Sequence, residues 1–192
     1  RYLNATTPFG ANLDSLADFV DFGIAPSLII YMWTLADLRL KPLGWAGVLI
    51  FAICGAIRLA RFNVSITLPK SVAKKIFFVG IPIPAGAILA ILPIMVSLEF
   101  PDITFVRSPV FNMIYLLTIA FAMASRIPTF SLKNIHVSKK NIKILLAAIG
   151  TLIVLLIVKP WITLMLICTC YIISIPISTV VFYKRLQKEQ ES

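Results

Sequence analysis

Six long apolar stretches, separated by short polar segments, dominate the hydrophobic pattern of this chain. A helix that crosses a bilayer needs about 20 mainly apolar residues, and each stretch comes close to that length. The stretches run over residues 12–36, 43–60, 76–98, 109–125, 142–158 and 161–183. Because the connections are short, we expect sequential helices to be antiparallel neighbours. The pattern therefore predicts an all-α fold, a polytopic transmembrane helix bundle with about six spans.

Proline residues interrupt several of these stretches. Membrane helices tolerate proline where neighbouring helices satisfy the freed backbone groups, so the prolines do not argue against a helical bundle. The run Ile81-Pro82-Ile83-Pro84 differs from the others because its two prolines are closely spaced, and the residue before a proline disfavours helix. We expect this run to delay or kink the start of the third helix.

The composition agrees with a surface that faces lipid. Of the 192 residues, 59% are hydrophobic and only 14% are charged, and the mean hydropathy is +0.96. Soluble domains usually contain about 25% charged and roughly 45–50% apolar residues. So little charge cannot cover a globular surface in water, and the composition excludes a soluble domain.

The 18 lysine and arginine residues alternate strongly between the two ends of the predicted helices. If Arg1 is cytoplasmic, 14 of them fall on the cytoplasmic side and four on the other. The smaller group is Arg39, Lys41, Arg107 and Lys159. Cytoplasmic loops of membrane proteins are enriched in Lys and Arg, so this distribution explains the net charge of +10 without a nucleic-acid partner. We expect a multi-pass protein of the cell (inner) membrane, with a polar cytoplasmic tail over residues 184–192.

Three of the eight acidic residues, Asp14, Asp18 and Asp21, lie together at the start of the first helix. Asp14 and Asp18 are four residues apart and share one helix face, about 6 Å apart along the axis. Carboxylates this close repel one another, and a divalent cation would offset the repulsion. Oxygen ligands without clustered His or Cys favour Mg²⁺, Mn²⁺ or Ca²⁺ over zinc. Spacing alone leaves a second interpretation equally open, a solvated helix start stabilised by the helix dipole.

Two upstream residues extend this pattern. Gly10 precedes Asp14 by four residues, and a missing side chain there lets a ligand approach the backbone. Arg1 lies nine residues before Gly10, and its planar guanidinium suits a phosphate. The spacing Arg1-x8-Gly10-x3-Asp14-x3-Asp18 resembles the second half of the signature of the CDP-alcohol phosphatidyltransferases. The first half, with two further aspartates, would lie before residue 1, so we expect an N-terminal truncation and two more spans in the intact chain.

The resemblance implies an enzyme that transfers the phosphatidyl group of CDP-diacylglycerol to an alcohol and releases CMP. By the family pattern, Asp14 and Asp18 hold Mg²⁺ or Mn²⁺, with two ions in the intact enzyme. Asp18 is then also the candidate catalytic base, Gly10 lines the CDP pocket and Arg1 binds phosphate. Asp21 is outside the motif, and we expect it to be a polar residue of the interface. The family domain would cover residues 1–183.

Further segments resemble the branch of the family that uses L-serine as the acceptor, the phosphatidylserine synthases. They are residues 14–26, 58–63, 80–85 and 125–131, and the last three fall at successive predicted cytoplasmic boundaries. Within them Arg58, Arg61, Asn63 and Arg126 are candidate ligands of the serine carboxylate or of a lipid phosphate. The alternative for the arginines is a membrane anchor that follows the positive-inside rule.

Two kinds of alternative stay open. Within the family, glycerol phosphate or inositol phosphate could replace serine as the acceptor. In another class, a proton- or ion-coupled transporter would carry acids inside the membrane, whereas the aspartates here lie at one interface and the later predicted spans carry none. The expected partners are CDP-diacylglycerol, L-serine and membrane lipids, without nucleic acid, and a homodimer is compatible with the sequence.

Overall fold

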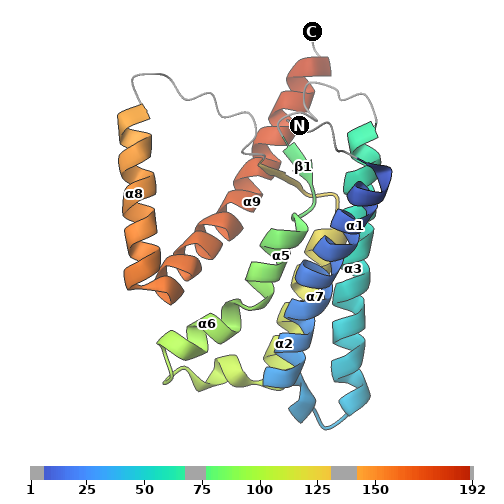
Figure 1. Ribbon diagram of the computed structural model, residues 1–192, viewed down its shortest axis with the longest axis vertical. Coiled ribbons are helices and arrows are strands. Elements are labelled where there is room, and N and C mark those ends of the chain that lie inside the picture. Colours follow the sequence, from blue (N-terminus) through green and yellow to red (C-terminus); the bar gives the residue numbers. More distant parts are fainter. Residues whose placement is uncertain (1–6, 68–76, 131–141, 191–192) are drawn as a thin grey trace. The chain divides into compact units, whose positions relative to one another are not determined.

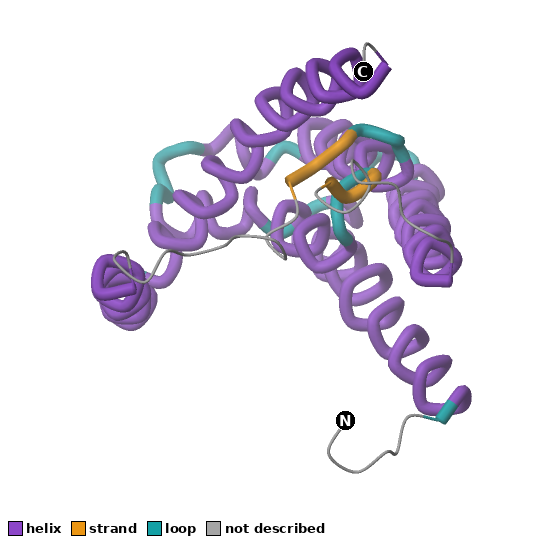
Figure 2. Tube along the Cα trace, turned by 90° about the horizontal axis from the view of Figure 1, so that it is seen from above, coloured by secondary structure: helices purple, strands orange, loops and turns teal. Residues whose placement is uncertain are grey.

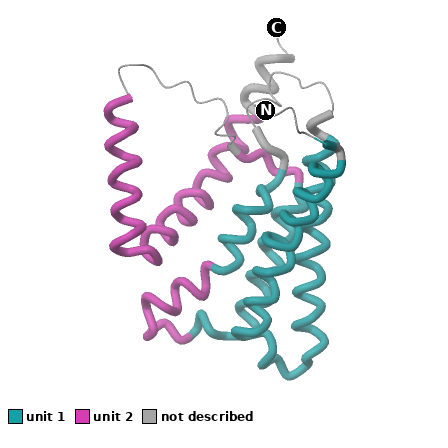
Figure 3. Tube along the Cα trace, in the orientation of Figure 1, with its two compact units in different colours: residues 1–68, 80–91, 105–125 teal, residues 69–79, 92–104, 126–192 magenta. Residues whose placement is uncertain are grey.

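The computed structural model describes residues 7–67, 77–130 and 142–190 of the chain. Helices predominate in these ranges, and one short pair of strands is present (Figure 1). The chain forms two compact units, which Figure 3 shows in different colours. Unit 1 comprises residues 1–68, 80–91 and 105–125, and unit 2 comprises residues 69–79, 92–104 and 126–192.

Unit 1 contains the two long apolar helices that come first in the chain. Its elements are α1 (Pro8–Phe19), η1 (Val20–Ile24), α2 (Ala25–Trp33), η2 (Leu35–Asp37), α3 (Lys41–Thr67), α5 (Ile83–Ala90), most of η3 (Thr104–Arg107) and α7 (Pro109–Ala124). The helix α3 packs against α7 and also contacts α1 and α2. The side chains of Ile30, Leu35, Phe51, Leu116 and Met123 are fully buried and form the centre of this unit.

Unit 2 combines three helices with a small antiparallel sheet. Its elements are β1 (Phe77–Val79), α6 (Leu92–Glu99), β2 (Pro128–Phe130), α8 (Ile142–Val158) and α9 (Pro160–Gln190). The two strands lie side by side (Figure 2), with Phe78 opposite Thr129. The helix α9 packs against β2, α6 and α8, and the Ser178 hydroxyl donates a hydrogen bond to the carbonyl oxygen of Pro128.

The helices confirm the predicted class, a helical membrane bundle. Within the residues that the structure describes, three helices are long and apolar enough to cross a membrane: Phe9–Trp33, Lys41–Val64 and Pro160–Phe182. Shorter apolar helices, Ile83–Glu99, Pro109–Ala124 and Ile142–Val158, lie at the other three predicted positions. Many large apolar side chains are exposed, among them every leucine of the first half of α8, as lipid contact requires.

The predicted helix over residues 76–98 needs a correction at its start and in its middle. Residues 77–79 form a strand, and the helix begins only at Ile83 because Pro82 holds an extended backbone, with φ −59° and ψ 144°. The helix also breaks at Ile91, between α5 and α6. Pro93 has no N–H to reach the carbonyl of Leu89, and the Tyr115 hydroxyl donates to that oxygen instead, at 2.8 Å.

A second proline shapes the first membrane helix. Between α1 and α2, residues 20–24 form a π-helical turn in which the Ala25 N–H donates to the carbonyl of Val20, five residues back. Pro26 removes the next backbone donor, which favours such a local irregularity. The buried Ser27 hydroxyl lies 3.1 Å from the Gly23 carbonyl oxygen and 2.8 Å from that of Ile24, so polar groups near this turn are satisfied within the helix.

Candidate active site

The helix that carries the aspartates begins at a well-formed N-cap. The Thr7 side chain accepts a hydrogen bond from the Gly10 N–H, with an oxygen-to-nitrogen distance of 3.0 Å. Pro8 takes the first helical position, where a missing N–H costs no helical hydrogen bond. This cap fixes the start of α1, and so places Gly10 in its first turn, exposed to the surroundings. Arg1 lies outside the described residues.

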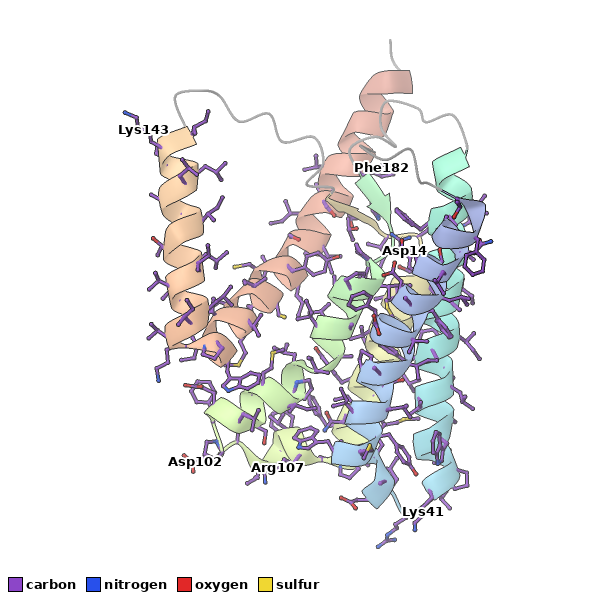
Figure 4. All side chains as sticks on the ribbon, in the orientation of Figure 1. Asp14, Lys41, Asp102, Arg107, Lys143 and Phe182 are labelled. Atoms are coloured by element: carbon purple, nitrogen blue, oxygen red, sulfur yellow. The ribbon has the colours of Figure 1, made fainter. Side chains whose placement is uncertain are left out.

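Asp14 and Asp18 occupy successive turns of α1, as their spacing predicts. The side chain of Asp14 is exposed and that of Asp18 is half-buried, so a ligand can reach both. Figure 4 places Asp14 toward one end of unit 1, whereas Lys41 and Arg107 lie at the opposite end. This separation agrees with the predicted assignment of Lys41 and Arg107 to the side of the membrane away from the aspartates.

The two carboxylates suit a divalent cation as a partial ligand set. Magnesium is commonly held by one or two protein carboxylates, with water and substrate phosphates filling the other positions. No group of three or more His, Cys, Asp or Glu side chains gathers within residues 7–67, 77–130 and 142–190. Asp14 and Asp18 therefore fit such an ion as two of its ligands, with their oxygen chemistry and their shared helix face as the supporting observations.

Two arginines in the last turns of α3 contact neighbouring segments at the end of unit 1 that carries the aspartates. Arg58 is only 5% exposed, and its Nε donates to the carbonyl oxygen of Ile81 at 3.1 Å. Its guanidinium carbon also lies 6.0 Å from the centre of the Phe62 ring. Arg61 is exposed, and its Nη1 donates to the carbonyl oxygen of Ala124, the last residue of α7. An arginine at this position satisfies an end carbonyl of α7 and complements the negative end of its helix dipole.

Gly80 completes this junction because only glycine fits there. Its φ of +77° is the left-handed region. A Cβ atom at this position would lie 2.6 Å from the carbonyl oxygen of Met123 and 2.8 Å from that of Ser125. The chain therefore enters α5 pressed against the C-terminal end of α7, beside Arg58.

The structure brings most of the predicted site residues into one unit. Asp14, Asp18, Arg58, Arg61 and Asn63 all belong to unit 1, and α1 contacts the helix that carries the last three. Arg126 belongs to unit 2 and is exposed. The substrate-binding roles of the arginines and of Asn63 stay predictions.

Sequence reasoning missed Ser15. This residue stands directly after Asp14, and its hydroxyl accepts a hydrogen bond from Asn63 Nδ2 at 3.0 Å. No spacing rule connects positions 15 and 63, because the contact joins two helices. The one signal in the sequence was a hydroxyl residue between two aspartates.

Comparison with known proteins assigns the family. A family model described as CDP-alcohol phosphatidyltransferase matches residues 1–124, and a second, CDP-alcohol phosphatidyltransferase 2, matches residues 143–176. The first match covers more than half of the 192 residues, and the chain belongs to the CDP-alcohol phosphatidyltransferase family. Enzymes of this family are phosphotransferases that in general depend on a divalent metal.

Several individual relatives share one name. The chain is 31% identical over 179 residues to a CDP-diacylglycerol–serine O-phosphatidyltransferase of Mycobacterium leprae, which covers 92% of this chain and 58% of the relative. Proteins of the same name from Helicobacter pylori strain J99 (43% identity over 100 residues, 52% of this chain and 40% of the relative) and Methanocaldococcus jannaschii (33% over 148 residues, 69% and 67%) are also similar. The chain spans about three-fifths of the length of the mycobacterial relative.

Proposed function

We propose that the protein transfers the phosphatidyl group of CDP-diacylglycerol to the hydroxyl of L-serine, giving phosphatidylserine and CMP. The observation that carries this proposal is the pair Asp14 and Asp18, both open to a ligand on one face of α1. The relatives named CDP-diacylglycerol–serine O-phosphatidyltransferase support serine as the acceptor. The segments at residues 58–63 and 80–85 resemble the branch of the family that uses L-serine, and they support serine as well.

In the proposed reaction the serine hydroxyl oxygen bonds to the phosphorus of the phosphatidyl group. The bond from that phosphorus to the CMP oxygen breaks, and CMP leaves with the electron pair. The half-buried Asp18 carboxylate takes the hydroxyl proton, and its fixed position on α1 matters more than its basicity. When bound at Asp14 and Asp18, Mg²⁺ or Mn²⁺ supplies charge neutralisation for the pyrophosphate, with two ions in the intact enzyme.

Binding of the two substrates falls to the remaining predicted residues. Gly10 leaves space for the CDP group at the first turn of α1, and Arg1 pairs with a phosphate. Arg58, Arg61 and Arg126 supply positive charge for the serine carboxylate or a lipid phosphate. A guanidinium has five N–H donors, so Arg61 can bind the carbonyl oxygen of Ala124 and still offer donors to a ligand.

The proposed site faces the cytoplasm of a cell (inner) membrane. The Lys and Arg distribution along the sequence supports this orientation. In this arrangement the lipid tails of CDP-diacylglycerol stay in the bilayer while its head group meets serine from the aqueous side. Assembly as a homodimer is part of the same proposal and is open to measurement by size in detergent.

Asp18→Asn tests the proposal directly. The full-length protein is supplied with CDP-diacylglycerol, Mg²⁺ or Mn²⁺ and labelled L-serine, and the release of CMP and the labelling of lipid are followed. We expect serine-dependent CMP release that falls at least about 100-fold in Asp18→Asn, because general-base catalysis typically contributes that much or more.

Asp21→Asn is the matched control, since Asp21 is exposed on the same helix segment but lies outside the family spacing. It should keep near wild-type activity. CMP release with glycerol phosphate or inositol phosphate instead of serine would keep the family chemistry and reject the acceptor. No CMP release with any alcohol would reject the enzymatic proposal and favour a transporter.

A further inference from the structure

A directed chain of two hydrogen bonds joins α3 to α1 beside the aspartates. The Ser15 hydroxyl donates to the carbonyl oxygen of Ala11, four residues back, at 3.1 Å. Its single proton is thereby used, so the oxygen is an acceptor toward Asn63 Nδ2, which donates to it at 3.0 Å. The amide of Asn63 is thus connected through Ser15 to the backbone of α1.

A second contact joins α3 to η1, the π-helical turn that directly follows α1. Gly23 and Gly55 are both buried, and a Cβ atom built on Gly55 would lie 3.6 Å from the Cα atom of Gly23. Small residues allow this close backbone approach between membrane helices. The contact lies eight residues after Ser15 on one helix and eight residues before Asn63 on the other. Eight residues of α-helix rise about 12 Å on α3, and the same number of residues separates the two contacts on the antiparallel segment formed by α1 and η1.

Asp18 lies between these two contacts along the chain, and Asp14 lies next to the first of them. Asp14 directly precedes Ser15, and Asp18 follows it by three residues, before the glycine contact. At about 100° per residue, the two carboxylates project about 100° and 60° away from the direction of Ser15, to the same side. They therefore stand beside the face that touches α3, and the orientation of that face sets where both carboxylates point.

Asn63 and Arg61, at the end of α3, contact different helices. They are two residues apart, so their side chains leave the helix about 200° apart. Arg61 reaches the last carbonyl of α7, whereas Asn63 reaches α1. The end of α3 thus holds α7 on one side and the aspartate-bearing helix on the other.

We propose that Ser15 and Asn63 are positioning residues, which hold the turn of α1 that carries Asp14 and Asp18 at the orientation that binds the catalytic cation. This inference rests on the proposed function, and it assigns the Asn63 amide nitrogen to Ser15 rather than to a substrate carboxylate. The hydrogen bond and the glycine contact act as two points of attachment, and removal of the first frees the N-terminal part of α1 to rotate.

A double-mutant cycle on the full-length protein tests the inference. Ser15→Ala, Asn63→Ala and the double variant are titrated with Mn²⁺, and binding is followed by electron paramagnetic resonance of the free ion, without substrate. We expect each single variant to weaken Mn²⁺ binding about three- to tenfold and the double variant to be no weaker than either one, because all three lose one shared bond. In the serine assay the same variants should require more Mn²⁺, while the KM for serine stays within twofold at saturating metal.

Two further variants separate this role from general stability. Ser15→Thr keeps the hydroxyl and should restore Mn²⁺ affinity to within twofold of wild type. Thr118→Ala removes an exposed hydroxyl that donates to the carbonyl four residues back on α7, and it should leave binding unchanged. Unchanged Mn²⁺ affinity in Ser15→Ala and Asn63→Ala, or a raised serine KM in Asn63→Ala alone, would overturn the inference while the reaction stands. A wild-type protein without CMP release would instead reject the proposed function.

Discussion

At the end of unit 1 where α3, α5 and α7 meet, residues stabilise the fold through contacts with backbone carbonyl groups as much as through their charges. A positive-inside anchor keeps its guanidinium in water or among lipid head groups. Arg58 does not, because it is 5% exposed and donates to the carbonyl of Ile81. Loss of Arg58 would therefore disturb the entry of the chain into α5 as well as any substrate contact. Gly80 offers a cleaner test of this junction than Arg58 does, because glycine has no side chain that could contact a substrate.

Gly80→Ala should destabilise the protein strongly. The new Cβ would meet the carbonyl oxygens of Met123 and Ser125 at 2.6 and 2.8 Å, and φ +77° is unfavourable for alanine. We expect a loss of about 2 kcal/mol or more in the free energy of unfolding. A thiol-reactive fluorophore that detects exposure of the buried Cys54 and Cys168 during heating would measure the lower Tm.

Gly150→Ala serves as the control for this substitution. Gly150 lies inside α8, and apart from the helix's own backbone no atom of the described residues would lie within 4 Å of an added Cβ there. Its Tm should stay the same or rise slightly, because alanine is the better helix former. Equal losses at both glycines would show that close contact at Gly80 is not the cause.

Single elements carry the irregularities that prolines impose on the membrane helices. The helix Phe9–Trp33 contains a π-helical turn directly before Pro26, and Ile83–Glu99 breaks at Ile91, before Pro93. In both places a neighbouring group satisfies the backbone, the Ser27 hydroxyl in one and the Tyr115 hydroxyl in the other. The π turn also lies between Asp18 and α2, so it sets the rotation of α1 relative to the rest of its helix.

Pro26→Ala should separate stability from activity. The alanine supplies an N–H to the helix, which favours regular α-helical geometry in place of the π turn. We expect an unchanged or higher Tm together with a several-fold loss of serine-dependent CMP release, because α1 rotates relative to α3. Full activity with a raised Tm would show that the π turn does not position the aspartates.

At the scale of the molecule, the two ends of unit 1 carry different charged residues. Asp14 lies toward one end of unit 1 and Lys41 and Arg107 toward the other, which matches the alternation of basic residues along the sequence (Figure 4). The hydrogen bond between Ser15 and Asn63 independently puts the start of α1 and the end of α3 on the same side. The proposed active site therefore has a definite side, whose cytoplasmic assignment can be measured.

Labelling of single cysteines tests that orientation. In a variant without native cysteines, Arg39→Cys and Val64→Cys place thiols at exposed positions before and near the end of α3. A membrane-impermeant maleimide should label Arg39→Cys in intact spheroplasts and Val64→Cys only after lysis. The opposite pattern would reverse the assignment and place the proposed site outside the cytoplasm.

The sequence by itself determined the class of fold and the chemistry of the aspartates. Apolar runs of about 20 residues leave a chain few choices besides membrane helices, and a four-residue step places Asp14 and Asp18 on one face wherever α1 lies. The family spacing added Gly10 and a function in the same way, from positions close together in the chain. The prolines at 82 and 84 also predicted the late start of α5, but they did not predict the strand before it.

Only the tertiary structure decided which helices carry the site together. The contacts of Ser15 with Asn63, of Gly23 with Gly55 and of Arg61 with the end of α7 join residues more than 30 positions apart. A periodic pattern specifies the buried face of a helix but not its neighbour, since many apolar faces are interchangeable. The pairing follows from close backbone approach at small residues and from polar groups that must find a partner at the helix ends, and both depend on the assembled bundle.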